Sequence, residues 1–204
     1  MDKETFFKII HKKLIVSCQA LENEPLHGSE IMAKMAQAAK EGGAVAIRSN
    51  SAKDVAAIKK KTALPVIGLV KRDYENSAVF ITATLKEVKE LLEVDPDVIA
   101  LDATIRERPN GETLEQLVSY IHKYSNTLVM ADIGTVKDAE YAVNCGADML
   151  STTLSGYTAD SPKLDGPDFD LVEILCKTMK ISVIAEGRIN TPHDAKKMLE
   201  TIVL

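Results

Sequence analysis

Apolar runs of strand length recur along the whole chain, and amphipathic segments of helical length separate most of them. The runs are nearly continuously apolar instead of alternating, which is typical of parallel strands buried on both faces. The segments between them, such as TLKEVKELLEV and TLEQLVSYIHKY, have the apolar spacing of helices that cover such a sheet. The pattern predicts strands near residues 13–19, 44–49, 65–71, 97–103, 127–133, 148–154 and 181–187.

Several helix starts share one signal, a hydroxyl side chain followed three positions later by an acidic or amide residue. The signal occurs at Ser51, Thr84, Thr113, Thr135 and Thr191. The first residues, MDKETFFKIIHKK, predict a leading helix that closes the amino-terminal end of the sheet.

Strand and helix alternate as in a (β/α)8 barrel or in a doubly wound open sheet. No GxGxxG follows the first strand and no GxxxxGK[ST] occurs, which weakens the nucleotide-binding form of the open sheet. We therefore predict an α/β fold, a (β/α)8 TIM barrel with an N-terminal capping helix, as one domain over residues 1–204. A full barrel usually takes about 250 residues, so 204 residues are short for one. With seven strands predicted, and from the family resemblance described below, we expect the eighth strand and last helix to be missing. The unpaired edges of the first and seventh strands then favour a homo-oligomer.

Composition narrows the classes of partner. The chain is 46% hydrophobic and 27% charged with a formal net charge of -5, which argues against nucleic acid or an anionic membrane as the main partner. No stretch approaches the roughly 18 consecutive apolar residues of a membrane span. The three cysteines, Cys18, Cys145 and Cys176, are odd in number and far apart, which suits free thiols in a cytoplasmic protein.

A polar or ionisable side chain stands where each apolar run finishes. In a barrel these positions meet at one opening, the carboxyl-terminal mouth, where active sites of this fold are built. Because strands commonly end in polar residues, one such residue would mean little, whereas seven at one mouth form a constellation. The residues are Gln19, Arg48, Lys71, Asp102, Asp132, Thr152 or Thr153, and Glu186 followed by Gly187.

Lys71 ends the run PVIGLVK. It is either a lysine that extends its amine from the barrel rim into solvent, or a desolvated amine whose lowered pKa lets it act as base or nucleophile. Glu186 has two interpretations as well. It either forms an ion pair with Arg188 or another cation at the rim, or serves as the carboxylate partner of Lys71. The third and seventh strands face each other across a barrel, so the two groups would flank a substrate. That arrangement suits epimerisation beside a carbonyl, by two groups or by one that shuttles the proton.

Other strand ends suggest binding roles. Arg48 suits a phosphate or carboxylate clamp, while Asp132 and Gln19 suit hydroxyl or amide groups or, alternatively, structural hydrogen bonds. Gly187 permits close backbone approach, and with Arg188 it stands where this fold often holds phosphate. The histidines have no metal-ligand spacing, so we expect no metal.

Longer segments carry a resemblance that covers almost the whole chain. They include SCQALENEPL, LPVIGLVKRDYENS, DVIALDATIRERPNGETL, MADIGTVKDAEYAVNCGADMLSTTLSGYT and VIAEGRINTP. With these segments the sequence resembles the N-acetylmannosamine-6-phosphate 2-epimerases, (β/α)8-barrel enzymes of bacterial sialic acid and amino-sugar catabolism. The resemblance implies interconversion of N-acetylmannosamine 6-phosphate and N-acetylglucosamine 6-phosphate without a metal or nucleotide cofactor. It places the catalytic lysine on Lys71, its carboxylate neighbour on Glu186, and sugar contacts on Gln19, Arg48 and Asp132.

The implied chemistry fits these residue types. The C2 proton becomes acidic when the sugar ring opens to an aldehyde, and a neutral lysine can then remove it. A Schiff base between Lys71 and the aldehyde is conceivable, but deprotonation needs no covalent step. Two alternatives share the same residues: another phosphosugar barrel enzyme, such as a Schiff-base aldolase or a decarboxylase, and a non-catalytic phosphosugar-binding protein.

Overall fold

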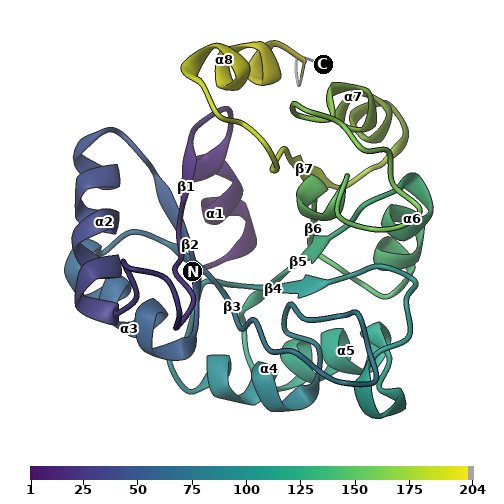
Figure 1. Cartoon of the computed structure of the whole chain (residues 1–204), viewed down its shortest axis with the longest axis horizontal. Coiled ribbons are helices and arrows are strands. Elements are labelled where there is room, and N and C mark those ends of the chain that lie inside the picture. Colours follow the sequence, from purple (N-terminus) through teal and green to yellow (C-terminus); the bar gives the residue numbers. More distant parts are fainter. Residues whose placement is uncertain (202–204) are drawn as a thin grey trace.

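Parallel strands follow one another in chain order around a curled sheet, and each strand is hydrogen-bonded to the next (Figure 1). The computed structural model describes residues 1–201. The strands are β1 (Ile15–Cys18), β2 (Ala46–Asn50), β3 (Val66–Leu69), β4 (Val98–Asp102), β5 (Leu128–Asp132), β6 (Met149–Ser151) and β7 (Ser182–Ile184). Each falls inside or within one residue of a predicted apolar run, and the predicted α/β barrel architecture is confirmed. Within residues 1–201 the sheet has seven strands, with β1 and β7 at its edges.

Helices follow the strands and surround the sheet (Figure 1). They are α1 (Lys3–Ile10), α2 (Ser29–Glu41), α3 (Ala52–Thr62), α4 (Leu85–Leu92), α5 (Leu114–Tyr124), α6 (Val136–Asn144), α7 (Phe169–Thr178) and α8 (Pro192–Thr201), with short 3-10 turns η1 (Pro109–Gly111) and η2 (Thr152–Leu154). The predicted caps are confirmed, because each predicted hydroxyl accepts a backbone N–H of the first helical turn. Thr84 and Thr113 form complete capping boxes. No helix among residues 1–201 is long and apolar enough to cross a membrane.

Side chains along each strand alternate between two apolar layers. In β2, Ala46 belongs to the core inside the curled sheet, while Ile47 belongs to the core beneath the helices. In β5, Met130 faces inward and Val129 outward. This alternation matters for function, because residues two positions beyond an inward side chain also point inward, at the end of the strand.

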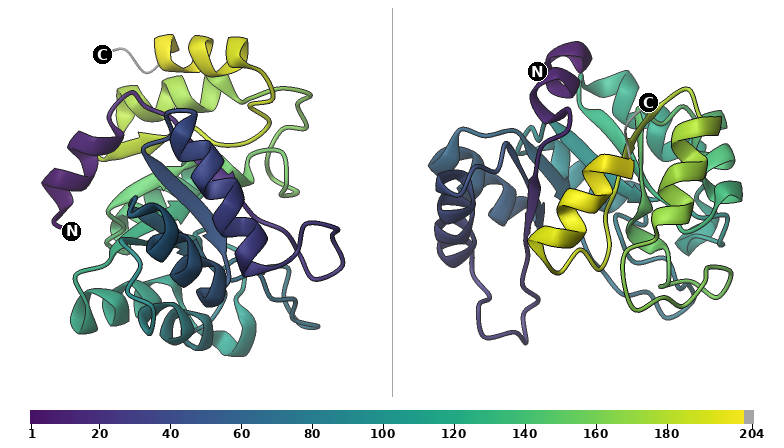
Figure 2. Two further views of the ribbon diagram at one scale, coloured as in Figure 1. Left: turned by 90° about the vertical axis from the view of Figure 1, so that its left-hand side faces the viewer. Right: turned by 90° about the horizontal axis from the view of Figure 1, so that it is seen from above.

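The leading helix α1 closes one end of the barrel, as predicted. Its Phe6 and Ile10 are buried in the inner core beside Ile67 and Met130. Figure 2 shows α1 at one end of the molecule and the loops after β1 and β6 at the other. The mouth formed by the carboxyl ends of the strands is therefore the end away from α1.

Candidate active site

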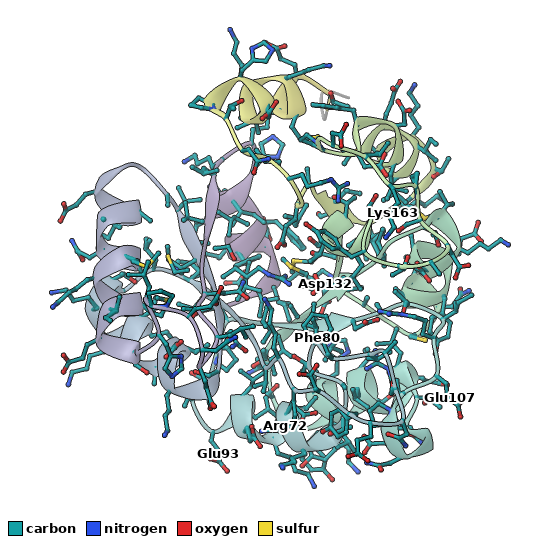
Figure 3. All side chains as sticks on the ribbon, in the orientation of Figure 1. Arg72, Phe80, Glu93, Glu107, Asp132 and Lys163 are labelled. Carbon is teal, nitrogen blue, oxygen red and sulfur yellow. The ribbon has the colours of Figure 1, made fainter. Side chains whose placement is uncertain are left out.

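The predicted strand-end residues meet at the carboxyl-terminal mouth. Arg48 and Asp132 lie two positions beyond the inward-facing Ala46 and Met130, so the strand alternation directs both side chains into the barrel. Asp132 lies toward the middle of the ring in Figure 3. Lys71 follows β3 and Glu186 follows β7 by two residues each. The fold thus brings together residues that are up to 138 positions apart in the chain.

Arg48 and Asp132 form a buried bidentate ion pair. Arg48 Nη1 donates to Asp132 Oδ1 at 3.0 Å, and Nη2 donates to Oδ2 at 2.7 Å. The side chains are only 4% and 0% exposed. Glu186 Oε1 lies 3.3 Å from Arg48 Nε, so a single guanidinium faces two carboxylates. Arg48, predicted as a clamp for a ligand anion, is engaged by protein carboxylates in this structure.

Hydroxyl groups at the end of β6 hold Glu186 in place. Thr152 Oγ1 donates to the Glu186 carbonyl at 2.8 Å and accepts the Glu186 N–H at 3.0 Å. Thr153 Oγ1 lies 2.8 Å from Asp132 Oδ1 and 3.0 Å from Glu186 Oε2. Ser151 Oγ lies 3.2 Å from Glu186 Oε2. The prediction named Thr152 or Thr153 and missed Ser151; the run of three hydroxyl residues at this strand end was the available signal.

Lys71 is half-buried at the mouth, and no ion pair of its amine occurs within the described part of the chain. Burial lowers the pKa of Lys71, and the positive charge of Arg48 lowers it further. The carboxylates of Glu186, Glu24 and Asp132 oppose this shift. An amine with a lowered pKa, close to carboxylates but not neutralised by one, can take up a proton from a bound substrate.

The two carboxylates are not equivalent. Burial raises the pKa of Asp132 to about 6, and although Arg48 opposes the shift, the neighbouring Glu186 adds to it. Glu186 keeps 27% of its side chain exposed, whereas Asp132 is fully covered. Of the pair, only Glu186 has side-chain surface exposed.

Gln19 has one unfilled hydrogen-bonding position. Its Nε2 donates to Ser17 Oγ at 2.5 Å, while its buried Oε1 has no partner among residues 1–201. Buried acceptors normally have partners, so the unpaired oxygen marks Gln19 as a candidate ligand contact.

Arg188 anchors a loop. Its Nε donates to the Gly166 carbonyl at 2.7 Å and its Nη1 to the Ser155 carbonyl at 2.6 Å. The guanidinium also lies over the Tyr157 ring, 5.5 Å from its centroid. Lys163, labelled in Figure 3, donates to the carbonyl of Gly156 in the same loop. The two Arg188 bonds tie the segment after β6 to the segment after β7, next to Gly187.

Asp102, the remaining strand-end acid, is used to hold its own loop. It is fully buried, pairs with Arg106 Nη2 at 2.6 Å and accepts the Thr104 hydroxyl at 2.7 Å. Among residues 1–201 no three histidine, cysteine, aspartate or glutamate side chains group as a metal site. His122 pairs with Asp148 at 2.9 Å, at the junction of α6 and β6 and away from the mouth.

Comparison with known proteins identifies relatives along most of the chain. The family model described as "Putative N-acetylmannosamine-6-phosphate epimerase" matches residues 32–204. A relative from Clostridioides difficile, named "Putative N-acetylmannosamine-6-phosphate 2-epimerase", is 57% identical over 92% of this chain and 84% of its own length. A relative of the same name from Clostridium perfringens is 54% identical over 94% of this chain and 86% of its own.

Solved structures agree with this assignment. The N-acetylmannosamine-6-phosphate 2-epimerase of Clostridium perfringens has a TM-score of 0.93 and 52% sequence identity, over 96% of this chain and 85% of that one. A thiamine phosphate pyrophosphorylase from Pyrococcus furiosus has a TM-score of 0.62 at 20% identity, over 93% of this chain and 82% of that one, and so shares the fold. By the matched family model and by relatives more than half identical over nine-tenths of its length, the chain belongs to the N-acetylmannosamine-6-phosphate 2-epimerase family.

Proposed function

We propose that the chain interconverts N-acetylmannosamine 6-phosphate and N-acetylglucosamine 6-phosphate by moving a proton at C2 of the ring-opened sugar. Family membership supports the substrate class. The observation that carries the proposal is the half-buried amine of Lys71, with no ion pair among the described residues, beside the carboxylates that Arg48 holds together.

The reaction requires a base and a path for returning the proton. Neutral Lys71 takes the C2 proton, and the electron pair of the broken C–H bond moves toward the C1 carbonyl to form an enolate. Protonation of C2 from the opposite face then inverts the centre. In a two-base reaction a protonated Glu186 supplies that proton. In a one-base reaction the enolate first turns its other face toward Lys71, which then returns the proton it took.

The binding residues have separate proposed roles. Gln19 offers its free amide oxygen to a sugar or acetamido donor. Arg48 and Asp132 organise the carboxylate cluster beside the sugar. Gly187 lets the backbone approach the phosphate, and Arg188 holds the loops that enclose it.

The central experiment compares Lys71→Ala with Lys177→Ala, an exposed lysine on the outer helix α7. We expect Lys71→Ala to lower turnover by about 100- to 10,000-fold and to abolish deuterium wash-in at C2, while sugar phosphate still binds. Lys177→Ala should match the parent protein. Near-normal turnover of Lys71→Ala would show that Lys71 is not the base and only extends its amine from the barrel rim into solvent.

A second variant separates the one-base and two-base reactions. Glu186→Gln should lower kcat about as strongly as the loss of one proton-transfer group, roughly 100-fold or more, if Glu186 transfers a proton. A change confined to KM would make Glu186 a binding residue. Trapping of substrate on Lys71 by borohydride would instead favour the Schiff-base aldolase class.

The remaining assignments concern the whole chain. We propose one barrel domain over residues 1–204, of which 202–204 lie outside the described residues. We also propose that the protein acts in the cytoplasm, where its three free cysteines stay reduced. A homo-oligomer is supported by the backbone edges that β1 and β7 present within residues 1–201. Sedimentation at several protein concentrations tests it, and a monomer at every concentration would contradict it.

A further inference from the structure

The regular β2–β3 ladder stops just before Lys71. Asn50 pairs with Leu69 in the parallel register, and the Ser51 N–H donates to the Leu69 carbonyl at 2.8 Å. Continuing the same pattern, the next bond would run from the Lys71 N–H to the Ser51 carbonyl. That carbonyl is already engaged, because it accepts the Val55 N–H at 3.1 Å in the first turn of α3.

Ser51 turns out of the ladder to cap this helix. Its φ is +76°, and its side chain accepts the Asp54 N–H. The Lys71 N–H is therefore left without its ladder partner, and the side chain of Asn50 replaces it. Asn50 Oδ1 accepts the Lys71 N–H at 2.8 Å. Since the donor is a backbone N–H, the bonded atom of Asn50 must be the amide oxygen.

A second side chain holds the residue before Lys71. Thr82 Oγ1 accepts the Val70 N–H at 3.1 Å, and the Thr82 N–H donates to the Val70 carbonyl at 2.7 Å. Thr82 is fully buried, and its φ is +45°. A positive φ is unusual for a β-branched residue and persists only where the surroundings hold it.

The segment that carries Thr82 fills a gap in the sheet. β3 and β4 pair only at Ile67 with Val98 and at Gly68 with Ile99. Beyond these pairs, Ile81 takes the place of a strand: it bridges Lys71 in antiparallel fashion, and its carbonyl accepts the Asp102 N–H at 3.0 Å. The main chain around Lys71 is thus held from the β2 side by Asn50 and from the β4 side by this returning segment.

We propose that Asn50 and Thr82 are positioning residues that set the depth and direction at which Lys71 enters the mouth. The inference rests on the proposed role of Lys71 as the base. Neither side chain caps a helix: Ser51 caps α3 without Asn50, and Thr82 precedes Thr84, the capping residue of α4. They instead bond the backbone of Val70 and of Lys71, which together set where the Lys71 amine lies. Proton transfer depends steeply on such placement.

The test pairs a disruptive and a conservative variant at each site. Asn50→Ala and Thr82→Val remove the acceptor oxygen, whereas Asn50→Asp and Thr82→Ser keep one. We expect the disruptive variants to lower kcat by about 10- to 100-fold with KM changed by less than about threefold. The conservative variants should recover most of kcat. Thr62→Val is the matched control. Thr62 is buried to 1% exposure, and its hydroxyl bonds the Ile58 carbonyl and the Leu64 N–H at the end of α3 that leads into β3, so the change should leave kcat unchanged.

Each outcome has a defined meaning. Disruptive variants that keep kcat within twofold of the parent would overturn the proposal, as would a rise in KM at constant kcat. If one disruptive variant does not fold, the other one and both conservative variants still report on kcat. Lys71→Ala, assayed in parallel, distinguishes a failure of the proposed function from a failure of the positioning roles. Full activity of Lys71→Ala would refute the proposed function itself, whereas an inactive Lys71→Ala beside normal Asn50 and Thr82 variants refutes only the positioning roles.

Discussion

Asp148 ties the end-closing helix to the barrel, and its replacement gives a quantitative prediction. Its carboxylate accepts from Lys3 Nζ of α1 at 2.8 Å, from His122 Nε2 of α5 at 2.9 Å and from the Val129 N–H of β5 at 2.9 Å. Burial alone would raise the pKa of Asp148. The bonds from His122, Lys3 and Val129 outweigh burial and lower it from 3.8 to about 2.

That shift can be converted into stability. At about 1.36 kcal/mol per pKa unit, lowering the pKa from 3.8 to about 2 corresponds to about 2.4 kcal/mol of unfolding free energy. For a protein of this size, about 2–4 °C of Tm accompany each kcal/mol. Asp148→Asn, which removes the charge, should therefore lower Tm by about 5–10 °C near pH 7. Because the folded pKa is the lower one, this contribution is complete above pH 3.8 and is lost as pH falls through about 2.

Thermal unfolding followed by circular dichroism between about pH 7 and pH 2 measures both effects. The control is Lys3→Ala, which removes only a partner that is 55% exposed and should change the unfolding free energy by less than about 1 kcal/mol. An Asp148→Asn protein with the parent Tm at neutral pH would refute the reasoning. A difference in Tm between Asp148→Asn and the parent protein that widens as pH falls would also refute it, because the charge of Asp148 would then stabilise the protein at low pH instead of at neutral pH.

Three further predictions concern the base, the loop anchor and the closing helix. Because burial lowers the pKa of Lys71 below 10.5, a pH–rate profile should show kcat/KM rising with pH and levelling off before that value; a rise that continues past it would contradict the assignment. Gly156→Ala should raise KM by about tenfold in steady-state assays. A Cβ at this position would lie 2.5 Å from Arg188 Nη1, and the φ of +82° would add backbone strain of about 1–3 kcal/mol. An unchanged KM would mean that this loop does not contribute to substrate binding. In denaturant titrations Phe6→Ala should lower the free energy of unfolding by about 3–5 kcal/mol, and the less buried Phe7→Ala by clearly less. Equal losses would mean that α1 does not fill the end of the barrel.

Local sequence pattern was sufficient for the strands, the helix caps and the positions that reach the mouth. Continuous apolar runs mark buried parallel strands, and a hydroxyl before an acidic residue marks a cap, because both depend on interactions within a few residues. The strands are shorter than the runs: the run 65–71 contains β3 only as Val66–Leu69. Val70 and Lys71 belong to the same run but leave the backbone ladder of β2: the side chain of Thr82 bonds Val70, and the side chain of Asn50 bonds Lys71. A local pattern cannot reveal this.

Partner choice at the mouth could not be predicted, because it depends on how the sheet curls. Arg48 was expected to hold a ligand anion, yet Asp132, far away in sequence, lies at bidentate distance once β2 and β5 face each other. In the sequence Asp102 and Asp132 look equivalent, because each stands at the end of a strand. Asp102 differs only because Arg106, four residues later, folds back onto it.

The carboxylate cluster has a consequence for how charge is handled during turnover. In the proposed one-base reaction both carboxylates are ionised and Lys71 is neutral, so Arg48 balances one of the two negative charges of Asp132 and Glu186, and one negative charge is left over. In the proposed step Lys71 takes the C2 proton and its new positive charge balances that excess, while the enolate formed in the same step carries one negative charge. In the proposed reaction the carboxylate cluster of Asp132 and Glu186 therefore provides the counterion of protonated Lys71. In that reaction no ion has to enter or leave the mouth together with the proton.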